Sequence, residues 1–307
     1  MIKYIIKRFL MMIFTLFLVA AATFFLMRAI PGGPFTTDRV LPPEVEAAVE
    51  AKYNLDQPLI NQFFDYIWGL LHFDFGPSYV FRGLTVNDMI ESGWPPSAIL
   101  GLLATLLIVV VGIPLGILAA LRRNKLTDRI IMLICTIAAG IPSYVIGMFL
   151  LYFFAVDHQI LPSYGVDSWL GYIMPTFCLA IGGICGTARL TRSSMLDAQG
   201  QDYVRTAKSK GLSPRYIVIH HVLRNSLIPV VTSLGLTFAA LLTGTFAIES
   251  IFAVPGLGQH FVNTITNRDY TAVMGMTVLS SAIMLLAVFI IDIIYGILDP
   301  RIKLYER

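Results

Sequence analysis

The sequence predicts an all-α integral membrane protein with six transmembrane helices, a structured outer loop and a short cytoplasmic helix. Its 307 residues are 56% hydrophobic and only 13% charged, whereas soluble proteins carry about 25% charged residues. Six uncharged stretches are long enough to cross about 30 Å of hydrocarbon as helices. They cover residues 9–27, 94–121, 130–156, 168–188, 226–248 and 270–291, and the last is expected to continue to Leu298.

These stretches favour helices over the strands of a membrane barrel, because they are long and lack strict alternation. Basic residues precede the first stretch, as in a signal peptide, but its apolar run extends to Met27. The apolar core of a signal peptide has about 7–15 residues. We therefore expect a retained membrane anchor.

The distribution of basic residues predicts the orientation. With the N-terminus inside, 17 of the 22 Lys and Arg residues fall in cytoplasmic segments. These segments are the N-terminus, the turn that contains residues 122–129, the loop 189–225 and the C-terminus. An excess of Lys and Arg marks the cytoplasmic side. We expect a multi-pass protein of the bacterial cytoplasmic membrane with both termini in the cytoplasm.

Composition and motifs exclude several other classes. A net charge of +3 does not suggest nucleic acid as the main partner. The sequence contains no P-loop, HExxH or GxSxG motif, so we expect no ATP site, metalloprotease or hydrolase. Cys135, Cys178 and Cys185 all lie in apolar stretches without a CxxC motif. They are interpreted as small buried residues, and we expect no metal or cofactor.

Two acidic residues qualify as candidate pathway residues. Asp292 lies within the last apolar stretch, where a carboxylate is costly and often functional. Pairing with a Lys or Arg at the inner interface is equally compatible with its position. Glu249 follows the fifth stretch at its outer end. It could be a solvated residue that caps the loop, or it could lie at the mouth of a transport pathway.

Helix breakers and small residues are frequent in the apolar stretches. Pro142 and Pro229 lie within or at the edge of stretches, and Gly112 with Gly116 and Gly182 with Gly186 form small-xxx-small pairs. Such residues allow bends and close helix packing.

The outer loop, residues 28–93, is expected to be folded. One short helix is predicted from Pro42 to Tyr53. A second is predicted after Pro58 and ends near Asp74. The second carries an apolar face that includes Phe63, Phe64, Ile67, Leu70 and Leu71. Packing on the outer ends of the spans is the simpler interpretation, and contact with an extracytoplasmic partner is the alternative.

The cytoplasmic loop, residues 189–225, contains the clearest local signals. Gly211 follows the short basic run 202–210 at the position where glycine ends a helix. Ser213 is placed as an N-cap with Pro214 at the first helical position. A solvated basic loop near anionic lipid would not need this turn chemistry. The pattern therefore predicts a short helix that docks onto a cytoplasmic partner.

Several segments along the whole chain carry a family resemblance. They include RAIPGGPF, HFDFGPS, YVRTAKSKGLSPRYIVIHHVLRNSLIPV, IESIFAVPGLGQHFVNTITNRDY and DIIYGILDPRIK. In this order they resemble the permease subunits of ABC importers for oligopeptides and dipeptides, most closely the first of the two permeases. The resemblance implies a single permease domain over residues 1–307.

The same resemblance assigns a role to the cytoplasmic helix. It is similar to the coupling motif EAAxxG of these importers, with Thr206, Ala207 and Lys208 at the EAA positions and Gly211 as the glycine. The missing Glu and the Lys at the second Ala position depart from the general motif. The resemblance implies that this coupling helix, with Arg205, contacts an ATPase subunit. Catalysis would lie on that partner, so the chain itself is not expected to be an enzyme.

The implied assembly is a heterodimer with a second homologous permease, two ATP-binding subunits below and an extracytoplasmic peptide-binding protein above. Peptides, in particular oligopeptides, are the expected substrate, and near relatives transport glutathione or nickel. A proton-coupled secondary transporter is the first rival hypothesis, but it would need more intramembrane ionisable residues and internal repeats. A membrane scaffold is the second, and it would not need the coupling-type loop.

Overall fold

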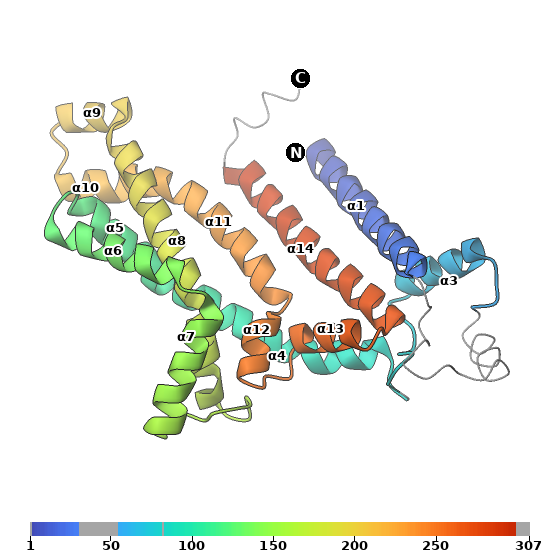
Figure 1. Cartoon of the computed structure of the whole chain (residues 1–307). Helices are drawn as coiled ribbons and strands as arrows, with labels where there is room; N and C mark the ends of the chain where they lie inside the picture. The colour runs from blue at the N-terminus through green and yellow to red at the C-terminus, as the bar shows by residue number, and fades with distance from the viewer. Residues whose placement is uncertain (1, 31–54, 82, 299–307) are drawn as a thin grey trace. The chain divides into compact units, whose positions relative to one another are not determined.

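The structure is a computed structural model that describes residues 2–30, 55–81 and 83–298. The described residues are helical apart from turns, loops and one isolated bridge between Pro77 and Thr85 (Figure 1). The predicted all-α class is confirmed. The chain divides into two compact units, Met1–Pro95 with Pro255–Arg307, and Pro96–Val254. The long helix α4 (Val86–Leu107) begins in the first unit and ends in the second.

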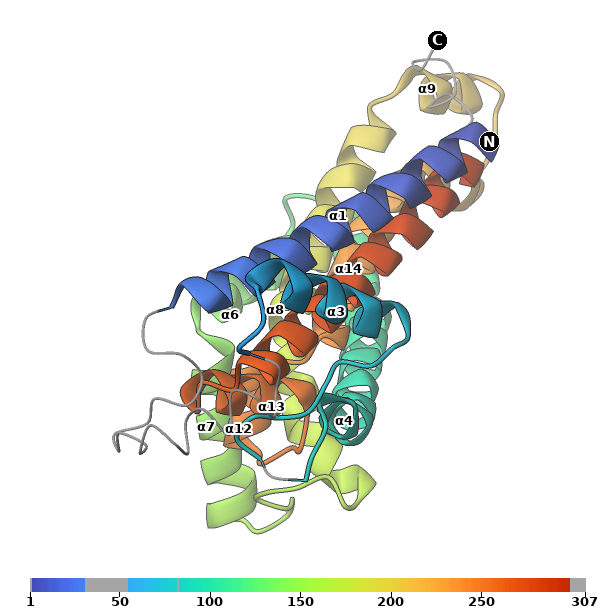
Figure 2. The same cartoon turned by 90° about the vertical axis from the view of Figure 1, so that its right-hand side faces the viewer.

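The first unit is built on two long antiparallel helices. Helices α1 (Ile2–Ala29) and α14 (Tyr270–Leu298) run beside each other (Figures 1 and 2). Helix α13 (Leu257–Thr266) precedes α14, and α3 (Leu59–Leu71) packs on α1. The predicted extension of the last span to Leu298 is confirmed.

Aromatic packing holds α3 against the long helices. Phe63 of α3 is buried with Phe24 of α1 and Met274 of α14, and the two phenylalanine rings lie 5.4 Å apart. The packing interpretation of this helix is confirmed for Phe63 and Ile67. It is wrong for Phe64 and Leu71, which are exposed in this chain, because the broad predicted face is wider than the strip that α1 and α14 cover. The helix predicted from Pro42 to Tyr53 lies outside the described residues.

The outer segment after α3 is fastened by buried polar contacts. Asp269 is fully buried at the start of α14, where it accepts hydrogen bonds from the Ser78 hydroxyl, the Tyr79 N–H (3.2 Å) and the Ala272 N–H (3.3 Å). The Asn87 side chain accepts from the Phe75 N–H at 3.0 Å. These contacts make the described part of the outer loop an ordered layer, as the sequence predicts.

The second unit is organised around the 27-residue helix α8 (Ile173–Gln199), which has its most extensive contacts with four other α-helices. These are α5 (Ile113–Leu121), α6 (Leu126–Gly140), α7 (Ser143–Leu150) and α11 (Arg224–Leu242). Short π-helical segments, η1 (Ile108–Gly112), η2 (Leu151–Asp157) and η4 (Val218–Leu223), continue or precede the main helices, and η3 (Trp169–Tyr172) is a 3₁₀ turn. The remaining helices are α9 (Asp202–Ser209), α10 (Pro214–Ile217) and α12 (Phe246–Ile251).

The described residues contain five continuous helices that are long and apolar enough to cross a membrane, or six if a bent pair counts as one span. The bent pair replaces the straight span predicted over residues 130–156. It consists of α6 and the helix Ser143–Asp157, which meet at 94°. Pro142 causes the break, because a residue before proline disfavours the helical region, and Ile141 is extended at φ −93° and ψ 124°.

The predicted fifth span also differs at both ends. The continuous helix begins at Pro214 and ends at Leu242, whereas the sequence predicted 226–248. It ends early because Gly244 has a φ of +86°, a conformation that glycine adopts without steric cost. Helix α12 is therefore a separate element.

The two predicted glycine pairs behave differently. A Cβ atom at Gly116 would lie 2.5 Å from the Thr191 Cβ and 2.6 Å from the Ala188 carbonyl oxygen, and Gly112 is also closely packed against α8. By contrast, a Cβ built at Gly182 or Gly186 has no atom of the described residues within 4 Å, apart from its own helix backbone and chain neighbours. The first pair thus permits the close approach of α5 to α8, and the second lies on an open face of α8.

Gly116→Ala should therefore destabilise the chain, whereas Gly186→Ala should not. The added methyl group at position 116 forces α5 and α8 apart, and overpacking of this kind costs about 1–3 kcal/mol. Thermal unfolding of the purified chain in detergent checks this, with Gly186→Ala as the matched control. Equal melting temperatures for the two variants would contradict the proposed close approach.

Candidate functional site

Helix α9 ends in a well-formed glycine turn. Gly211 has a φ of +75°, and the N–H groups of Gly211 and Leu212 donate to the carbonyl oxygens of Lys208 (2.9 Å) and Ala207 (3.4 Å). This pair of hydrogen bonds is the Schellman arrangement, which satisfies the last carbonyls of a helix. The predicted positive φ of Gly211 is confirmed, and the helix ends at Ser209 with Lys210 as its cap.

The next helix begins as the sequence predicts. The Ser213 hydroxyl accepts a hydrogen bond from the Tyr216 N–H at 3.4 Å, and Pro214 occupies the first turn. This start leads into the continuous helix that ends at Leu242. Two helices therefore flank a four-residue turn, residues 210–213, which fixes the angle at which α9 leaves the bundle.

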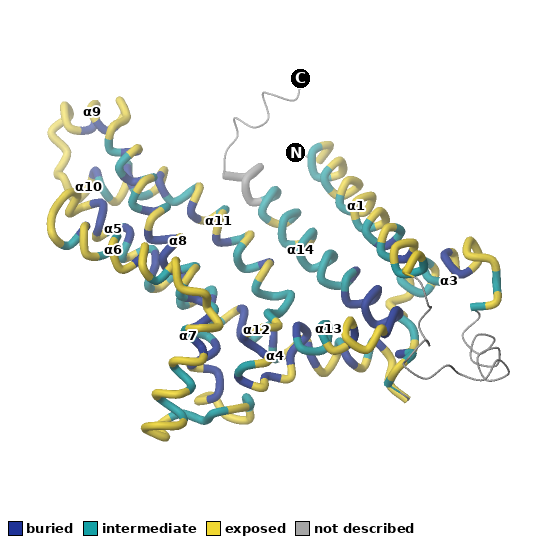
Figure 3. The backbone as a smooth tube through the Cα atoms, in the orientation of Figure 1, coloured by how far each residue is buried: buried dark blue, intermediate teal, exposed yellow. Residues whose placement is uncertain are grey.

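One face of α9 is seated on the second unit. Val204 and Ala207 are buried in an apolar cluster with Ala120 of α5 and with Met195 and Ala198 of α8. We call this cluster the α9 seat; Ile217 and Val222 complete its buried members. Val204 and Ala207 are three positions apart and are the buried residues of α9, whose other residues are exposed (Figure 3). Any displacement of α9 must therefore act on the ends of α5 and α8.

The other face of α9 is exposed and basic. Arg205, Thr206 and Lys208 are all exposed. Arg205 makes one loose contact with Asp202 at 3.5 Å, and their side chains are 76% and 94% exposed. Solvated pairs of this kind contribute little to stability. Among the predicted coupling residues, Ala207 thus faces the seat, whereas the other helical members are available to a partner.

Glu249 is buried, so the interpretation of this residue as a solvated cap of the loop is wrong. It is 1% exposed and accepts hydrogen bonds from the Ser97 hydroxyl of α4 (2.8 Å) and the Thr245 N–H (3.0 Å). The carboxylate therefore caps the start of α12 and connects it to α4 within the second unit. A pathway role for Glu249 stays a prediction.

Asp292 forms an ion pair within the first unit. One of its oxygens lies 2.9 Å from Nη1 of Arg8 on α1, and the Arg8 and Asp292 side chains are 41% and 18% exposed. Of the two alternatives for Asp292, pairing with a basic residue is observed, and a pathway role stays a prediction. The pair joins the first turns of α1 to the last turns of α14.

Two buried carboxylates escaped the sequence analysis. Asp128 forms a forked ion pair with Arg192 of α8, and Asp269 fastens the outer segment. Both residues lie just outside the apolar stretches, so their sequence positions suggest ordinary solvent-exposed charges in loops. The available signal was local: Asp128 lies in the first turn of a helix after Lys125, and Asp269 directly precedes the last span.

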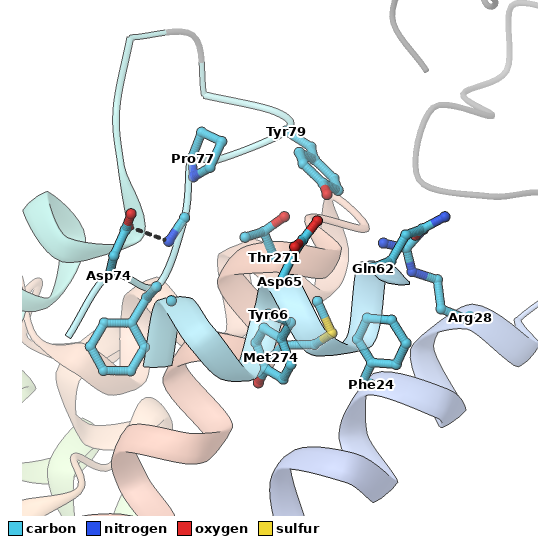
Figure 4. A pocket seen from close by; sticks show the side chains of 13 residues that line it. Phe24, Arg28, Gln62, Asp65, Tyr66, Asp74, Pro77, Tyr79, Thr271 and Met274 are labelled. Atoms are coloured by element: carbon cyan, nitrogen blue, oxygen red, sulfur yellow. Dashed lines mark hydrogen bonds between the residues drawn. The ribbon is translucent and has the colours of Figure 1, made fainter. Parts of the chain in front are cut away.

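A pocket of about 210 Å³, lined by both polar and apolar side chains, lies in the first unit between α1, α3 and the start of α14. Gln62 and Thr271 are 8% and 6% exposed. Among the described residues, the Gln62 Oε1, Thr271 Oγ1, Tyr66 hydroxyl and Arg28 Nε atoms have no hydrogen-bond partner. Figure 4 shows the side chains that line it. Burial raises the pKa of Tyr66, which keeps its phenol neutral. A cavity of this size with polar atoms in its lining suits ordered water. No group of three potential metal ligands occurs among the described residues.

Comparison with protein families identifies the class of this chain. The profile of the family described as "Binding-protein-dependent transport system inner membrane component" matches residues 112–304, and the profile of its N-terminal part matches residues 1–77. The chain belongs to this family. It is a multi-pass membrane component of an ABC transport system and not an enzyme.

Individual relatives agree with this assignment over the whole chain. The chain is similar to the dipeptide transport system permease protein of Bacillus subtilis, with 45% identity over 307 residues and 100% of both chains covered. It is 41% identical to the oligopeptide transport system permease protein of Salmonella typhimurium, with 99% of this chain and 100% of the relative covered. The resemblance read from the sequence motifs is confirmed.

A solved structure supports the fold. A chain of the inward-facing MetNI methionine ABC transporter matches with a TM-score of 0.55 and 19% sequence identity, covering 69% of this chain and 96% of the other. At this identity the similarity concerns the fold alone.

Asp292→Asn should have a small effect on stability, about 0–1 kcal/mol, because its partner Arg8 is well exposed to solvent. Arg8→Gln should have the same effect, since either change removes the same pair. Thermal unfolding of the two variants and of the double variant measures this. Complete loss of transport by Asp292→Asn, with normal insertion and stability, would show that the carboxylate acts in the pathway instead.

Proposed function

We propose that the chain is one of two homologous permeases in an ATP-driven importer that carries peptides across the bacterial cytoplasmic membrane. The two permeases enclose the translocation path. Two ATP-binding subunits dock on the cytoplasmic side and hydrolyse ATP, and a peptide-binding protein delivers the substrate from outside. This chain provides half of the path and a mechanical connection to one ATPase.

The observation that carries the proposal is full-length similarity to named peptide permeases. The relatives described above are a dipeptide and an oligopeptide permease, which favours peptides over glutathione or nickel. Identity to the dipeptide permease, 45%, exceeds identity to the oligopeptide permease, 41%. The proposal therefore names peptides as a class and does not retain the sequence-based preference for oligopeptides.

The distribution of charge supports the proposed topology. If the bent pair of α6 and Ser143–Asp157 crosses the membrane once, then α9, the N-terminus and the C-terminus share one side. That side holds 17 of the 22 basic residues, as expected for the cytoplasm. A re-entrant bent pair would instead place the basic segment 189–225 outside. The single crossing is favoured.

The shape of the α9 region supports docking to an ATPase. A short helix with a buried apolar face and an exposed basic face, closed by a rigid turn, presents a fixed surface to the cytoplasm. The open face of α8 at Gly182 and Gly186 suits close packing against a helix of the second permease.

Uptake of labelled peptides in a strain that lacks this chain tests the function. The proposal predicts loss of uptake in the deletion strain, recovery with the wild-type chain, and co-purification of two ATP-binding subunits. Uptake that depends on the proton gradient and is catalysed by the purified chain alone would contradict it and favour a secondary transporter.

Gly211→Val should disconnect α9 from the ATPase while the spans insert normally. A β-branched residue in this left-handed conformation costs about 1–3 kcal/mol of local strain, and α9 would leave the bundle at a different angle. We expect normal expression, pairing with the second permease and a loss of stimulated ATP hydrolysis.

The matched control is Gly200→Ala at the other end of the same connection. Gly200 has an ordinary φ of −80°, and the atom nearest to a built Cβ is 3.4 Å away. This variant should hydrolyse ATP and import peptides as the wild type does. Normal peptide uptake by Gly211→Val would contradict the role of the turn.

A further inference from the structure

The ion pair between Asp128 and Arg192 has a forked geometry with two hydrogen bonds. Arg192 donates from Nε to one carboxylate oxygen of Asp128 at 2.6 Å and from Nη2 to the other at 2.7 Å. Such forked pairs are stronger and more directional than single contacts. Asp128 is 2% exposed and the Arg192 side chain 25%.

A third hydrogen bond fixes the carboxylate from its own side. The Asn124 N–H donates to Asp128 Oδ2 at 2.9 Å, and Asn124 has a φ of +61° in the turn between α5 and α6. If Arg192 were displaced together with α8, the Asp128 carboxylate could move with it only by disturbing this turn. The pair joins α8 to the whole α5–α6 hairpin.

The position of the pair relates it to α9. Arg192 lies on α8 seven residues before its end at Gln199, and α9 begins at Asp202. Between Arg192 and the end of α8, Met195 and Ala198 form part of the α9 seat, to which α5 contributes Ala120. The hairpin thus contacts α8 through apolar packing, as at Gly116 against Thr191 and at Cys135 against Cys185, through the seat, and through the ion pair.

We propose that Asp128 and Arg192 are positioning residues that make α8 and the α5–α6 hairpin move as one body when α9 is displaced. This inference rests on the proposed function, in which α9 receives force from an ATPase. The apolar packing between the hairpin and α8 contains no directional contact of its own. The forked pair resists sliding because both of its hydrogen bonds are directional, so force on α9 reaches α6 as well as α8.

The alternative is that the pair only stabilises the fold. The two roles differ in what they change. A pair that only stabilises the fold alters the amount of assembled importer. It leaves unchanged the number of peptides that each assembled complex imports per ATP hydrolysed. A positioning pair alters the number of peptides imported for each ATP hydrolysed by complexes that have assembled.

The test uses the complete importer, with its ATPases and peptide-binding protein, reconstituted in liposomes. Arg192→Lys keeps the charge but loses the fork, and Asp128→Asn keeps the side-chain shape. In both variants we expect assembled complexes that hydrolyse ATP but import at least about fivefold fewer peptides per ATP, the lower range of typical coupling between sites. The double variant should be no worse than either single variant, because paired residues are not additive.

Arg8→Lys is the matched control, since it makes the same substitution in the more exposed pair with Asp292. Its ratio of peptide to ATP should equal that of the wild type. Suppose that the wild-type importer imports peptides and that Arg192→Lys and Asp128→Asn import as many peptides per ATP as the wild type. That result would overturn the positioning role and leave the proposed function intact. Independent, multiplying losses in the double variant would also overturn it. A wild-type chain that binds no ATPase would overturn the proposed function and this inference together.

Discussion

Three buried carboxylates hold the described structure together where its helices begin. The hydrocarbon core of a bilayer offers no hydrogen bonds, and the first N–H groups of every helix lack partners within the helix. Asp128, Glu249 and Asp269 are each at most 2% exposed, and each accepts a backbone N–H at or just before a helix start. Each also binds a side chain from a distant segment: Arg192, Ser97 and Ser78, respectively.

This arrangement explains how a chain with many helix breaks can remain rigid where rigidity matters. The break at Pro142 and the turn at Gly244 separate short helices. The buried carboxylates connect such elements to the long helices. One of these long helices, α8, contacts α9 directly through the α9 seat. In the proposed importer, the same stiffness lets a cytoplasmic ATPase act on helices inside the membrane.

The sequence was sufficient for the local features and for the class. The turn at Gly211 and Ser213 was predictable because its residues are selected by backbone conformation and capping, which act over a few positions. The apolar stretches predicted the spans, but the sharp bend at Pro142 was not predicted, because a proline in a membrane helix can produce either a gentle kink or a break. The partners of Asp128 and Asp269 could not be predicted, because these contacts join residues 64 and 191 positions apart.

The central claim is that the exposed face of α9 meets an ATP-binding subunit in the cytoplasm. A photoreactive amino acid at Arg205, whose side chain is 76% exposed, tests this most directly in intact cells that express the whole importer. The account predicts an adduct with an ATP-binding subunit, and no such adduct from the same amino acid placed at the exposed Phe64 of α3. An active importer in which position 205 forms no adduct with an ATP-binding subunit, or reacts only with extracytoplasmic proteins, would contradict it.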